Sequence, residues 1–447
     1  MFWRLLIILK EAGSLTLFCY SLPSNEDKDK KIGQRLRLAC ERLGATYIKL
    51  GQMLSMRPDF IPAAYCIELE DLLDSAPTIP VRQIKKVIVQ ELGRPINQIF
   101  KNFCDKPLAA ASLSQVHRAT LFSGKKVVVK VLRPGVKKLI RQDIRCLKLF
   151  AHLVGNILLG GQKNSLDLVR TLQSWLDRET NYKEELNNIL IMAAELKDVK
   201  KVMVPKVYQD LSGENVLVME YVNGRSMLEI IRLKRRLAEP DFPYPLQELM
   251  ENLIEEMGIN SLKRAHFHAD LHPANVLIKP NGIIYLLDFG LIQYFDKRVR
   301  KNVALFMLGM ALASPELIIS ASKKLATFSP QYNEERVFSA LNEACDAYRD
   351  AAAAQMSNGQ LLIKIFSIGM TNGITFPWNL ILYTRSAMHL DGMILNLCPD
   401  FVFSNYSRQK FLRVYSEIIF KEIISLPAII ERADDIIEAL RKYSDKI

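Results

Sequence analysis

The spacing of apolar residues predicts that helices make up most of this chain. Apolar positions recur with helical periodicity over residues 32–103 and again over residues 137–198. Prolines act as helix breakers within the first of these segments. After Gly224 helical periodicity prevails once more.

Segments rich in β-branched residues separate the helical regions and predict strands. Residues 107–133 predict a strand, a turn at Ser123-Gly124 and the strand VVVKVL, which Pro134 ends. Residues 202–224 predict two or three further short strands. Later in the chain, Asn281-Gly282 between two apolar runs predicts a β-hairpin. A small sheet followed by a larger helical unit makes the predicted fold class α+β.

The composition indicates a folded globular protein that prefers anionic partners. Of 447 residues, 49% are hydrophobic and 24% are charged, and 60 Lys and Arg against 48 Asp and Glu leave a formal charge of +12. This charge favours nucleotides or acidic phospholipid surfaces as partners. Nucleic acid is not expected, because basic stretches such as residues 296–301 lack interleaved aromatic residues.

The cysteines predict a reducing compartment. Seven cysteines lie far apart in the sequence, and no two form a C-x-x-C pair. This spacing argues against a disulfide scaffold and against a structural zinc site. We therefore expect a cytoplasmic protein, and we expect its position to be peripheral, on the inner face of the membrane.

The N-terminal segment MFWRLLIILKEAGSLTLFCY predicts an apolar helix with two interpretations. Arg4, Lys10 and Glu11 interrupt its apolar run, so it falls short of the about 18 uninterrupted apolar residues of a spanning helix. A helix that carries Phe2, Trp3 and the aliphatic residues after them either lies on a membrane surface or docks on the protein's own body.

Three polar residues occur in an order that suits phosphoryl transfer. Lys130 ends the run VVVK, where its cation can hold two phosphate oxygens. Asp270 and Asn275 lie five residues apart in HADLHPAN and present a carboxylate and an amide oxygen from one loop. Such a loop supplies an acid or base together with a magnesium ligand, which is most of what phosphoryl transfer needs from a protein.

Asp288 extends this set in the motif LLDFG. It lies thirteen residues after Asn275, directly after the second strand of the predicted hairpin. A carboxylate at a strand end, before the permissive Gly290, can reach Mg²⁺, which prefers oxygen ligands. The succession of D-x-x-x-x-N, hairpin and DFG is more specific than any one of these motifs alone.

An acidic residue on a helix is expected to hold the lysine in such a site. Glu179 and Glu185, both in the helical segment DRETNYKEELNN, are the candidates to pair with Lys130. The sequence leaves both alternatives open.

With these motifs in place, the chain resembles the UbiB (aarF-domain) family of atypical kinases over about residues 40–400. KLGQ at residues 49–52 resembles that family's K-x-G-Q signature, and PLAAASLSQVHRA resembles its alanine-rich nucleotide loop. ETNYKEELNN resembles the segment E-x-D-Y-x-x-E-A-x-N, and FHADLHPANVL resembles the loop H-A-D-P-H-P-G-N.

The resemblance implies a two-lobed protein-kinase-like fold. Its parts would be a helical N-terminal extension over residues 1–105, a small β-sheet N-lobe over residues 106–222 and a mainly helical C-lobe with a helical tail over residues 223–447. It also implies binding of ATP or ADP with Mg²⁺. The K-x-G-Q helices are expected to cover the active site and obstruct protein substrates, which favours ATPase or small-molecule kinase activity.

The family's biology implies a role in ubiquinone or other isoprenoid-quinone biosynthesis at a membrane face. The partners implied are a nucleotide, anionic phospholipid, and enzymes or lipids of the quinone pathway.

The resemblance also implies roles for individual residues. Asp270 orients the attacking water or hydroxyl group, and Asn275 and Asp288 bind the metal. The residues implied at the nucleotide are Ala109, Ala110, Ala111 and Ser112 of the alanine-rich loop, Lys130, Glu220 and Val222 of the strand MEYV that links the lobes, and Lys49 and Gln52 of the K-x-G-Q motif.

The sequence departs from the family pattern at four positions. Leu271 and Ala274 replace a proline and a glycine of the catalytic loop. Asn181 replaces the acid of the E-x-D-Y segment, and Leu73 stands where the extension often has glutamine. None of these positions is a predicted metal ligand, so the departures bear on rate and on contacts of the extension.

Two other functions compete with this interpretation. His266, His268, Asp270 and His272 form H-x-H-x-D-x-H, close to the H-x-H-x-D-H cluster of zinc metallohydrolases, but the last histidine is one position late and only His389 follows. The other alternative is a nucleotide-gated pseudokinase scaffold that transfers no phosphate. The intact catalytic and metal-binding positions favour catalysis over the scaffold.

Overall fold

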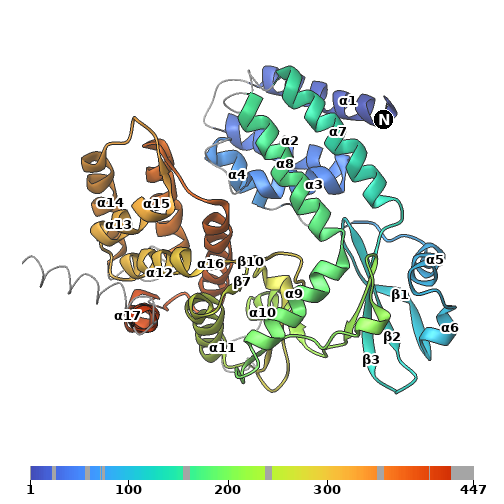
Figure 1. Cartoon of the computed structure of the whole chain (residues 1–447). Coiled ribbons are helices and arrows are strands. Elements are labelled where there is room, and N and C mark those ends of the chain that lie inside the picture. Colours follow the sequence, from blue (N-terminus) through green and yellow to red (C-terminus); the bar gives the residue numbers. More distant parts are fainter. Residues whose placement is uncertain are drawn as a thin grey trace, which may run out of the picture. The chain divides into compact units, whose positions relative to one another are not determined.

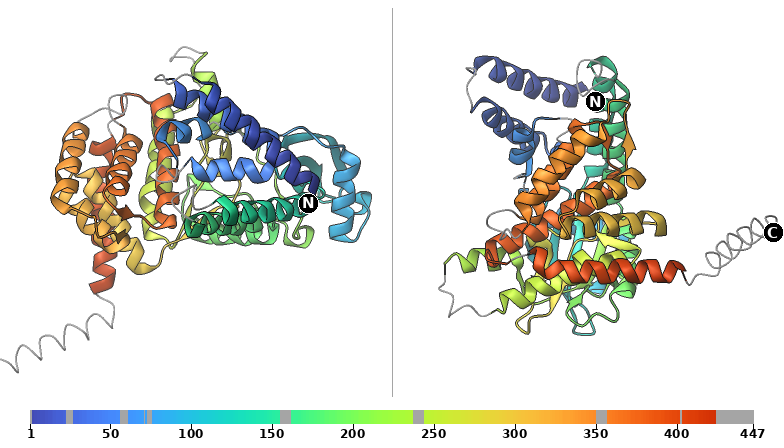
Figure 2. Two further views of the ribbon diagram at one scale, coloured as in Figure 1. Left: turned by 90° about the horizontal axis from the view of Figure 1, so that it is seen from above. Right: turned by 90° about the vertical axis from the view of Figure 1, so that its left-hand side faces the viewer.

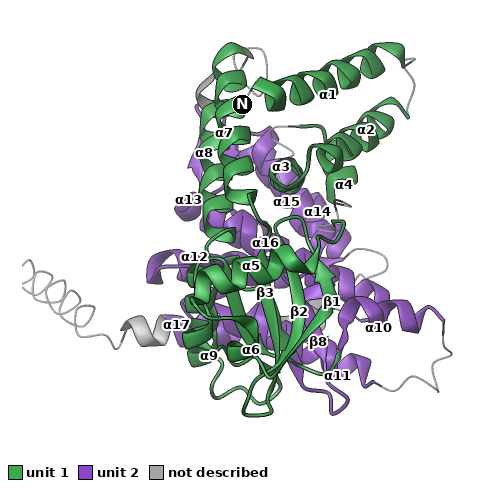
Figure 3. Cartoon of the chain, turned by 90° about the vertical axis from the view of Figure 1, so that its right-hand side faces the viewer, with its two compact units in different colours: residues 1–224, 285–291 green, residues 225–284, 292–447 purple. Residues whose placement is uncertain are grey.

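The structure is a computed structural model of the chain (Figure 1). It describes residues 2–22, 27–55, 61–70, 72, 76–154, 162–236, 244–349, 357–401 and 403–423, so the departure at Leu73 lies outside the described residues. The chain forms two compact units, called unit 1 (Met1–Gly224 with Tyr285–Leu291) and unit 2 (Arg225–Ile284 with Ile292–Ile447) (Figure 3). The division into extension, N-lobe and C-lobe stays a prediction.

Unit 1 begins with helices, which agrees with the periodicity of its first hundred residues. They are α1 (Phe2–Ser21), α2 (Lys28–Leu43), α3 (Ala45–Leu54), α4 (Ala63–Glu70), α5 (Val81–Leu92) and α6 (Ile96–Ile99). Side chains of α1 to α4 form an apolar cluster with α7 (Val136–Val154), in which Tyr47 and Leu69 are buried. The K-x-G-Q motif therefore lies on α3, within a packed helical layer.

A four-stranded antiparallel sheet follows, in the order β1-β2-β3-β5. Its strands are β1 (Asn102–Ala110), β2 (Ser114–Thr120), β3 (Lys126–Leu132) and β5 (Val216–Glu220). The sequence predicted one strand before the Ser123-Gly124 turn, which is wrong, because the chain reverses between β1 and β2. The Ala111 N–H donates to Ser114 O at 2.9 Å in this reversal. The predicted turn itself is confirmed, and Gly124 has a φ of 78° there.

The alternation of side chains along β3 determines the face of the sheet on which Lys130 lies. Val127, Val129 and Val131 are fully buried, in a core cluster that also contains Ile84 of α5. Lys130 lies on the opposite face of the sheet because successive residues of a strand point to opposite faces. Two helices complete this part of unit 1, α8 (Gln162–Glu179) and α9 (Tyr182–Glu195). Two short strands also occur, β4 (Val202–Met203), which precedes β5, and β9 (Ile284–Leu286), which precedes the DFG motif.

Unit 2 is mainly helical, as the sequence predicted. Its helices are α10 (Met227–Lys234), α11 (Leu246–Leu253), α12 (Lys297–Ala311), α13 (Pro315–Leu325), α14 (Glu334–Tyr348), α15 (Asn358–Thr371), α16 (Trp378–Leu397) and α17 (Phe403–Ile423). Residues 302–311 of α12 are all buried, so this helix forms the core of the unit, with α13 and α17 packed against it (Figure 2). Ser226 and Glu229 form a capping box that starts α10.

Short strands also occur in unit 2, which the periodicity did not predict beyond the hairpin. They are β6 (Arg225–Ser226), β7 (His266–His268), β8 (Val276–Ile278), β10 (Ile292–Tyr294), β11 (Thr327–Phe328) and β12 (Ile374–Thr375). The predicted turn at Asn281-Gly282 is confirmed, because Gly282 has a φ of 78° and its N–H donates to Lys279 O at 2.9 Å. β7 pairs with β10, and the catalytic-loop motif follows β7 directly.

None of the helices within the described residues combines the length and the apolarity that crossing a bilayer requires.

Candidate active site

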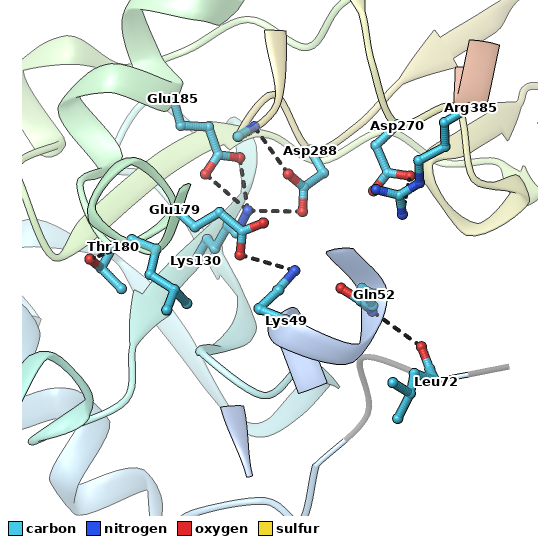
Figure 4. Close-up of polar contacts among 12 residues, drawn as sticks. Lys49, Gln52, Leu72, Lys130, Glu179, Thr180, Glu185, Asp270, Asp288 and Arg385 are labelled. Atoms are coloured by element: carbon cyan, nitrogen blue, oxygen red, sulfur yellow. Dashed lines mark hydrogen bonds and ion pairs between the residues drawn. The ribbon is translucent and has the colours of Figure 1, made fainter. Parts of the chain in front are cut away.

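Lys130 is the centre of a three-residue charge cluster in unit 1. Its Nζ donates to both carboxylate oxygens of Glu185, at 2.8 and 3.0 Å, and lies 3.3 Å from Asp288 Oδ2 (Figure 4). Glu185 is thus the glutamate that contacts the strand lysine. Its side chain is only 3% exposed, so its negative charge depends on this cation for compensation.

The start of α9 brings Glu185 to the lysine. Asn181 caps this helix, because its side-chain oxygen accepts a hydrogen bond from the Lys183 N–H. Glu185 follows one turn later, and the buried Tyr182 places its ring 5.3 Å from Lys130 Nζ. Asn181, which replaces the acidic residue of the family pattern, is therefore a favourable residue for the start of this helix.

The same helix fixes the DFG segment of unit 1. The Phe289 N–H donates to Glu185 Oε1 at 3.4 Å, and Asn188 Nδ2 donates to Phe289 O at 2.8 Å. Glu185 thus contacts β3 and the DFG motif at once.

Electrostatics keep Lys130 charged. Burial lowers the pKa of Lys130, but the negative charges of Asp288 and Glu185 outweigh burial and hold this pKa well above its ordinary value. Burial likewise raises the pKa of Glu185 above its ordinary value, and the Lys130 cation opposes that shift only in part. A lysine that stays protonated at a strand end can bind phosphate oxygens as a point charge.

Asp288 has a left-handed backbone conformation. Its φ is 53°, and Ala313 is the only other non-glycine residue with a positive φ among the described residues. The Gly290 N–H donates to Asp288 Oδ1 at 3.2 Å, yet the side chain remains 49% exposed. A half-exposed carboxylate beside a phosphate-binding cation is an oxygen donor of the kind Mg²⁺ prefers, so these residues fit a magnesium–nucleotide complex.

Glu179 contacts a different lysine. Lys49 Nζ of the K-x-G-Q motif lies 2.9 Å from Glu179 Oε2 (Figure 4). The same nitrogen lies 5.9 Å from the ring centre of Trp175. This pair lies close to the DFG segment, because a Cβ atom at Gly290 would lie 3.8 Å from Glu179 Cγ. The two candidate glutamates therefore form two separate lysine pairs within unit 1.

The other two residues of the motif fasten α3 to its surroundings. Gln52 Nε2 donates to Leu72 O at 3.1 Å. A Cβ atom at Gly51 would lie 2.3 Å from Leu72 Cδ1, so glycine is the residue that permits this close approach. Contact of Lys49 and Gln52 with a nucleotide stays a prediction.

The alanine-rich loop is a tight reversal at the end of β1. Ala109 and Ala110 pair with Val116 and Gln115 of β2, and Ser112 in the reversal is buried. Arg133 Nε donates to the carbonyl oxygen of Ala111 at 2.7 Å and holds the reversal from outside. The predicted nucleotide contact of these four residues stays a prediction.

The segment MEYV (residues 219–222) contains the end of β5, and its backbone is hydrogen-bonded to neighbouring segments. The Glu220 N–H donates to Lys206 O at 2.7 Å, and the Tyr221 N–H donates to Lys126 O at 3.1 Å. Val222 is buried. The structure places Glu220 and Val222 on the segment that leads to unit 2, and their contact with adenine stays a prediction.

Asp270 lies in unit 2, beside two basic side chains of α16. Its Oδ1 is 3.4 Å from Arg385 Nη2 and 3.4 Å from His389 Nε2. Asn275 Nδ2 donates to Asp270 O at 3.3 Å, which ties the two ends of the catalytic loop together. The sequence did not predict that Arg385 and His389 lie beside Asp270, and it marked His389 only as the one later histidine available to a zinc site.

The histidines of this loop have local roles in unit 2. The Asp270 N–H donates to His268 Nδ1 at 3.2 Å, and His266 packs its ring against Tyr294. Burial lowers the pKa of His272, and the nearby His389 lowers it further. Over the part of the chain that the structure describes, no three His, Cys, Asp or Glu side chains are grouped as metal ligands.

Two family models match the chain. A model of the ABC1 atypical kinase-like domain matches residues 71–320, and a model of the UbiB helical domain matches residues 341–402. The first range contains the Lys130 cluster and the catalytic loop, and the second contains α16 with Arg385 and His389.

Curated relatives agree with these matches. The protein ACTIVITY OF BC1 COMPLEX KINASE 7, chloroplastic, of Arabidopsis thaliana is 30% identical over 92% of this chain and 57% of its own length. A probable protein kinase UbiB of Marinobacter nauticus is 28% identical over 82% of this chain and 67% of its own length. An uncharacterized protein in the hydrogenase 1 5′ region of Clostridium pasteurianum is 29% identical over 86% of this chain and 71% of its own length.

A solved structure has the same fold. The complex structure of Rv3197 and erythromycin from Mycobacterium tuberculosis matches with a TM-score of 0.57 and 22% identity, over 80% of this chain and 90% of that chain. Together with the family matches, this likeness confirms the predicted α+β, two-lobed kinase-like fold.

Proposed function

This chain belongs to the ABC1 (UbiB) family of atypical kinases, and on that premise we propose that it binds Mg-ATP or Mg-ADP and acts as an ATPase or phosphotransferase. The observation that carries the proposal is the cluster of Lys130, Glu185 and Asp288 in unit 1. A buried acid holds a cation there, and a half-exposed acid beside it is available to a metal.

Each residue has one task in this proposal. Lys130 holds phosphate oxygens, and Glu185 keeps the lysine charged and in place. Asp288 and Asn275 would hold Mg²⁺, which neutralises phosphate charge when bound. Asp270 orients a water or hydroxyl group, whose oxygen bonds to the γ-phosphorus while the bond to the ADP oxygen breaks.

The helical extension supports hydrolysis or a small acceptor over a protein acceptor. Lys49 of α3 pairs with Glu179 next to the DFG segment, so the extension is fastened close to a part of the proposed site in unit 1. A segment fastened there restricts the room for a folded protein substrate. Lys49 and Gln52 remain candidates to lie near the phosphates.

The biological setting proposed is ubiquinone or another isoprenoid-quinone biosynthesis at a membrane face. Relatives that are named as probable protein kinase UbiB support this setting. The proposed partners are anionic phospholipid and the enzymes or lipids of that pathway, with a peripheral position on the inner face of the membrane.

The test is Mg-dependent ATP hydrolysis by the full chain, with and without anionic liposomes, together with nucleotide binding on the same samples. Asp270→Asn should bind nucleotide like the wild type and hydrolyse it at least about a hundredfold more slowly. Activity that rises with liposomes and requires Asp270 supports a membrane-coupled ATPase. Retained binding with no hydrolysis by the wild type would instead favour the pseudokinase scaffold.

A further inference from the structure

Helix α1 docks on unit 1 through one face. Arg4 Nε donates to Asp143 Oδ1 of α7 at 2.5 Å, and Arg4 Nη2 donates to Leu43 O at 2.5 Å. Asp143 is completely buried, so the ion pair with Arg4 is costly to break. Ile8, one turn after Arg4, is buried in the apolar cluster of α2, α3 and α7.

Further contacts on the docked face fix the rotation of the helix. Glu11 forms an ion pair with Arg42 of α2 at 3.0 Å, and the Ser14 hydroxyl accepts a hydrogen bond from Arg35 Nη2 at 2.7 Å. Positions 4, 8 and 11 recur at helical spacing, so these contacts hold one side of α1 against unit 1 over more than two turns.

Outside these docked contacts, α1 exposes a set of large apolar side chains. These side chains are between 41% and 84% exposed. They are Phe2, Trp3, Leu6, Ile7, Leu9, Leu17 and Tyr20. Phe2, Leu6, Leu9, Leu17 and Tyr20 fall within a narrow arc of the helix, which is about 30 Å long. They form two apolar groups near its two ends, with Gly13 and Thr16 on the same arc between them. We call these seven residues the α1 stripe.

We expect another apolar surface to cover the α1 stripe. Single exposed apolar residues are normal on a soluble protein, but several large apolar side chains grouped on one side of a helix mark an interaction surface. The docked face prevents α1 from rotating to bury the stripe in unit 1. Its occupant is therefore something outside this unit.

We propose that the α1 stripe inserts into the surface of an anionic phospholipid bilayer, with α1 parallel to the membrane plane. The inference gives the membrane face of the proposed function a defined surface, but it does not need the catalytic assignment. Aromatic rings stand at both ends of the stripe, Phe2 and Trp3 at one end and Tyr20 at the other, and such rings favour the level of the lipid headgroups.

Two observations favour a bilayer over a second copy of this chain. Lys10 is exposed within the arc of the stripe, close to the middle of the helix. Two antiparallel copies of α1 centred on each other would bring two Lys10 cations together, whereas at a bilayer this side chain can extend to the phosphates. The formal charge of +12 also repels a second copy and attracts anionic lipid.

The test is co-sedimentation of the full chain with vesicles of phosphatidylcholine alone and of phosphatidylcholine with phosphatidylglycerol. The wild type should bind the anionic vesicles more tightly. Leu6→Asp/Leu17→Asp should lower the partition coefficient more than about tenfold, because charges replace two aliphatic side chains that the proposal buries in the bilayer. Phe122→Asp/Ile363→Asp is the matched control, since it makes the same charge change at two exposed apolar residues outside α1.

Trp3 provides a second readout. Vesicles should shift the fluorescence emission of the wild type to shorter wavelength, and this shift should disappear in Trp3→Phe while that variant still sediments with vesicles. Circular dichroism and nucleotide binding on the same samples show that each variant is folded and report separately on the proposed function. No binding of the wild type to either vesicle would overturn the inference. A dimer that Leu6→Asp/Leu17→Asp dissociates, without any lipid binding, would also overturn it and assign the stripe to a second copy.

Discussion

Two regions of unit 1 each place a lysine against a glutamate, and they differ in what else surrounds the lysine. On β3, Lys130 contacts the almost fully buried Glu185 and also the half-exposed Asp288. On α3, Lys49 contacts Glu179 and the ring of Trp175. We call these regions the β3 cluster and the α3 pair.

The difference separates a site that can bind a ligand from a contact that holds two helices together. In the β3 cluster Glu185 is buried against Lys130, whereas Asp288 is half-exposed. A metal can therefore bind Asp288, and phosphates can take its place beside Lys130. Lys130 still compensates the charge of Glu185 when this happens. The α3 pair joins two helices, and its aromatic neighbour stabilises the cation in place. We therefore expect changes in the β3 cluster to abolish nucleotide binding and changes in the α3 pair to weaken it.

The largest effect is expected from Lys130→Met. It leaves the Glu185 carboxylate buried without its cation, so the free energy of unfolding should fall by about 3–5 kcal/mol. Nucleotide affinity should fall more than about a hundredfold. Denaturant unfolding and calorimetric titration with Mg-ATP measure the two effects.

The double variant Lys130→Met/Glu185→Leu separates stability from binding. Replacing both members of a buried ion pair by apolar residues of similar size is often nearly neutral, so most of the stability should return. Nucleotide binding should not return. Recovery of binding in the double variant would show that Lys130 is not the phosphate ligand.

Acidification should produce a smaller effect through Glu185. Burial raises the pKa of Glu185 above its ordinary value, so its proton is held more tightly in the folded than in the unfolded chain. Protonated Glu185 therefore favours the folded state at low pH, and that contribution is lost as the pH rises through the raised pKa. Nucleotide affinity is expected to fall on acidification, because protonated Glu185 no longer keeps Lys130 charged and in place.

The expected result is a decline of Mg-nucleotide affinity on acidification by about tenfold, with a midpoint above pH 4.5, the ordinary value for glutamate. Glu185→Gln is the matched control, because the nucleotide itself titrates equally with both proteins. The account fails here if Glu185→Gln and the wild type show the same pH profile.

The smallest effect is expected from Lys49→Met. The side chain of Glu179 is 15% exposed against 3% for Glu185, so water compensates the unpaired carboxylate in part. The loss of stability should therefore be smaller than for Lys130→Met, about 1–3 kcal/mol. Nucleotide affinity should fall by less than about tenfold. A loss of binding as large as that of Lys130→Met would remove the distinction between the two regions and place Lys49 directly on the phosphates.

Much of the fold was predictable because its signals are local. VVVK alternates buried and outward-facing residues, and Asn281-Gly282 supplies the positive φ that the turn needs. The reversal between β1 and β2 was missed, because Ala109 to Ser112 contain neither the glycine nor the proline that normally marks a turn.

The sequence predicted the residue types of the site, but it did not predict which of these residues contact one another. The sequence placed Glu179 and Glu185 in one helical segment. In the structure Asn181 starts a new helix between them, and the two glutamates contact different lysines. Arg385 and His389 reach Asp270 only because α16 packs near the catalytic loop within unit 2, and a contact between such distant segments leaves no local sequence signal.

The role of Asp288 as a metal ligand can be decided by the Mg²⁺ dependence of ATP binding, measured for Asp288→Asn and for the wild type. Calorimetric titrations of both proteins would be made with Mg²⁺ and with EDTA, beside thermal unfolding to show that the variant is folded. Mg²⁺ should tighten ATP binding to the wild type, and Asp288→Asn should lose this difference. Equal Mg²⁺ dependence in the two proteins would contradict the assignment of Asp288, and with it the proposed site.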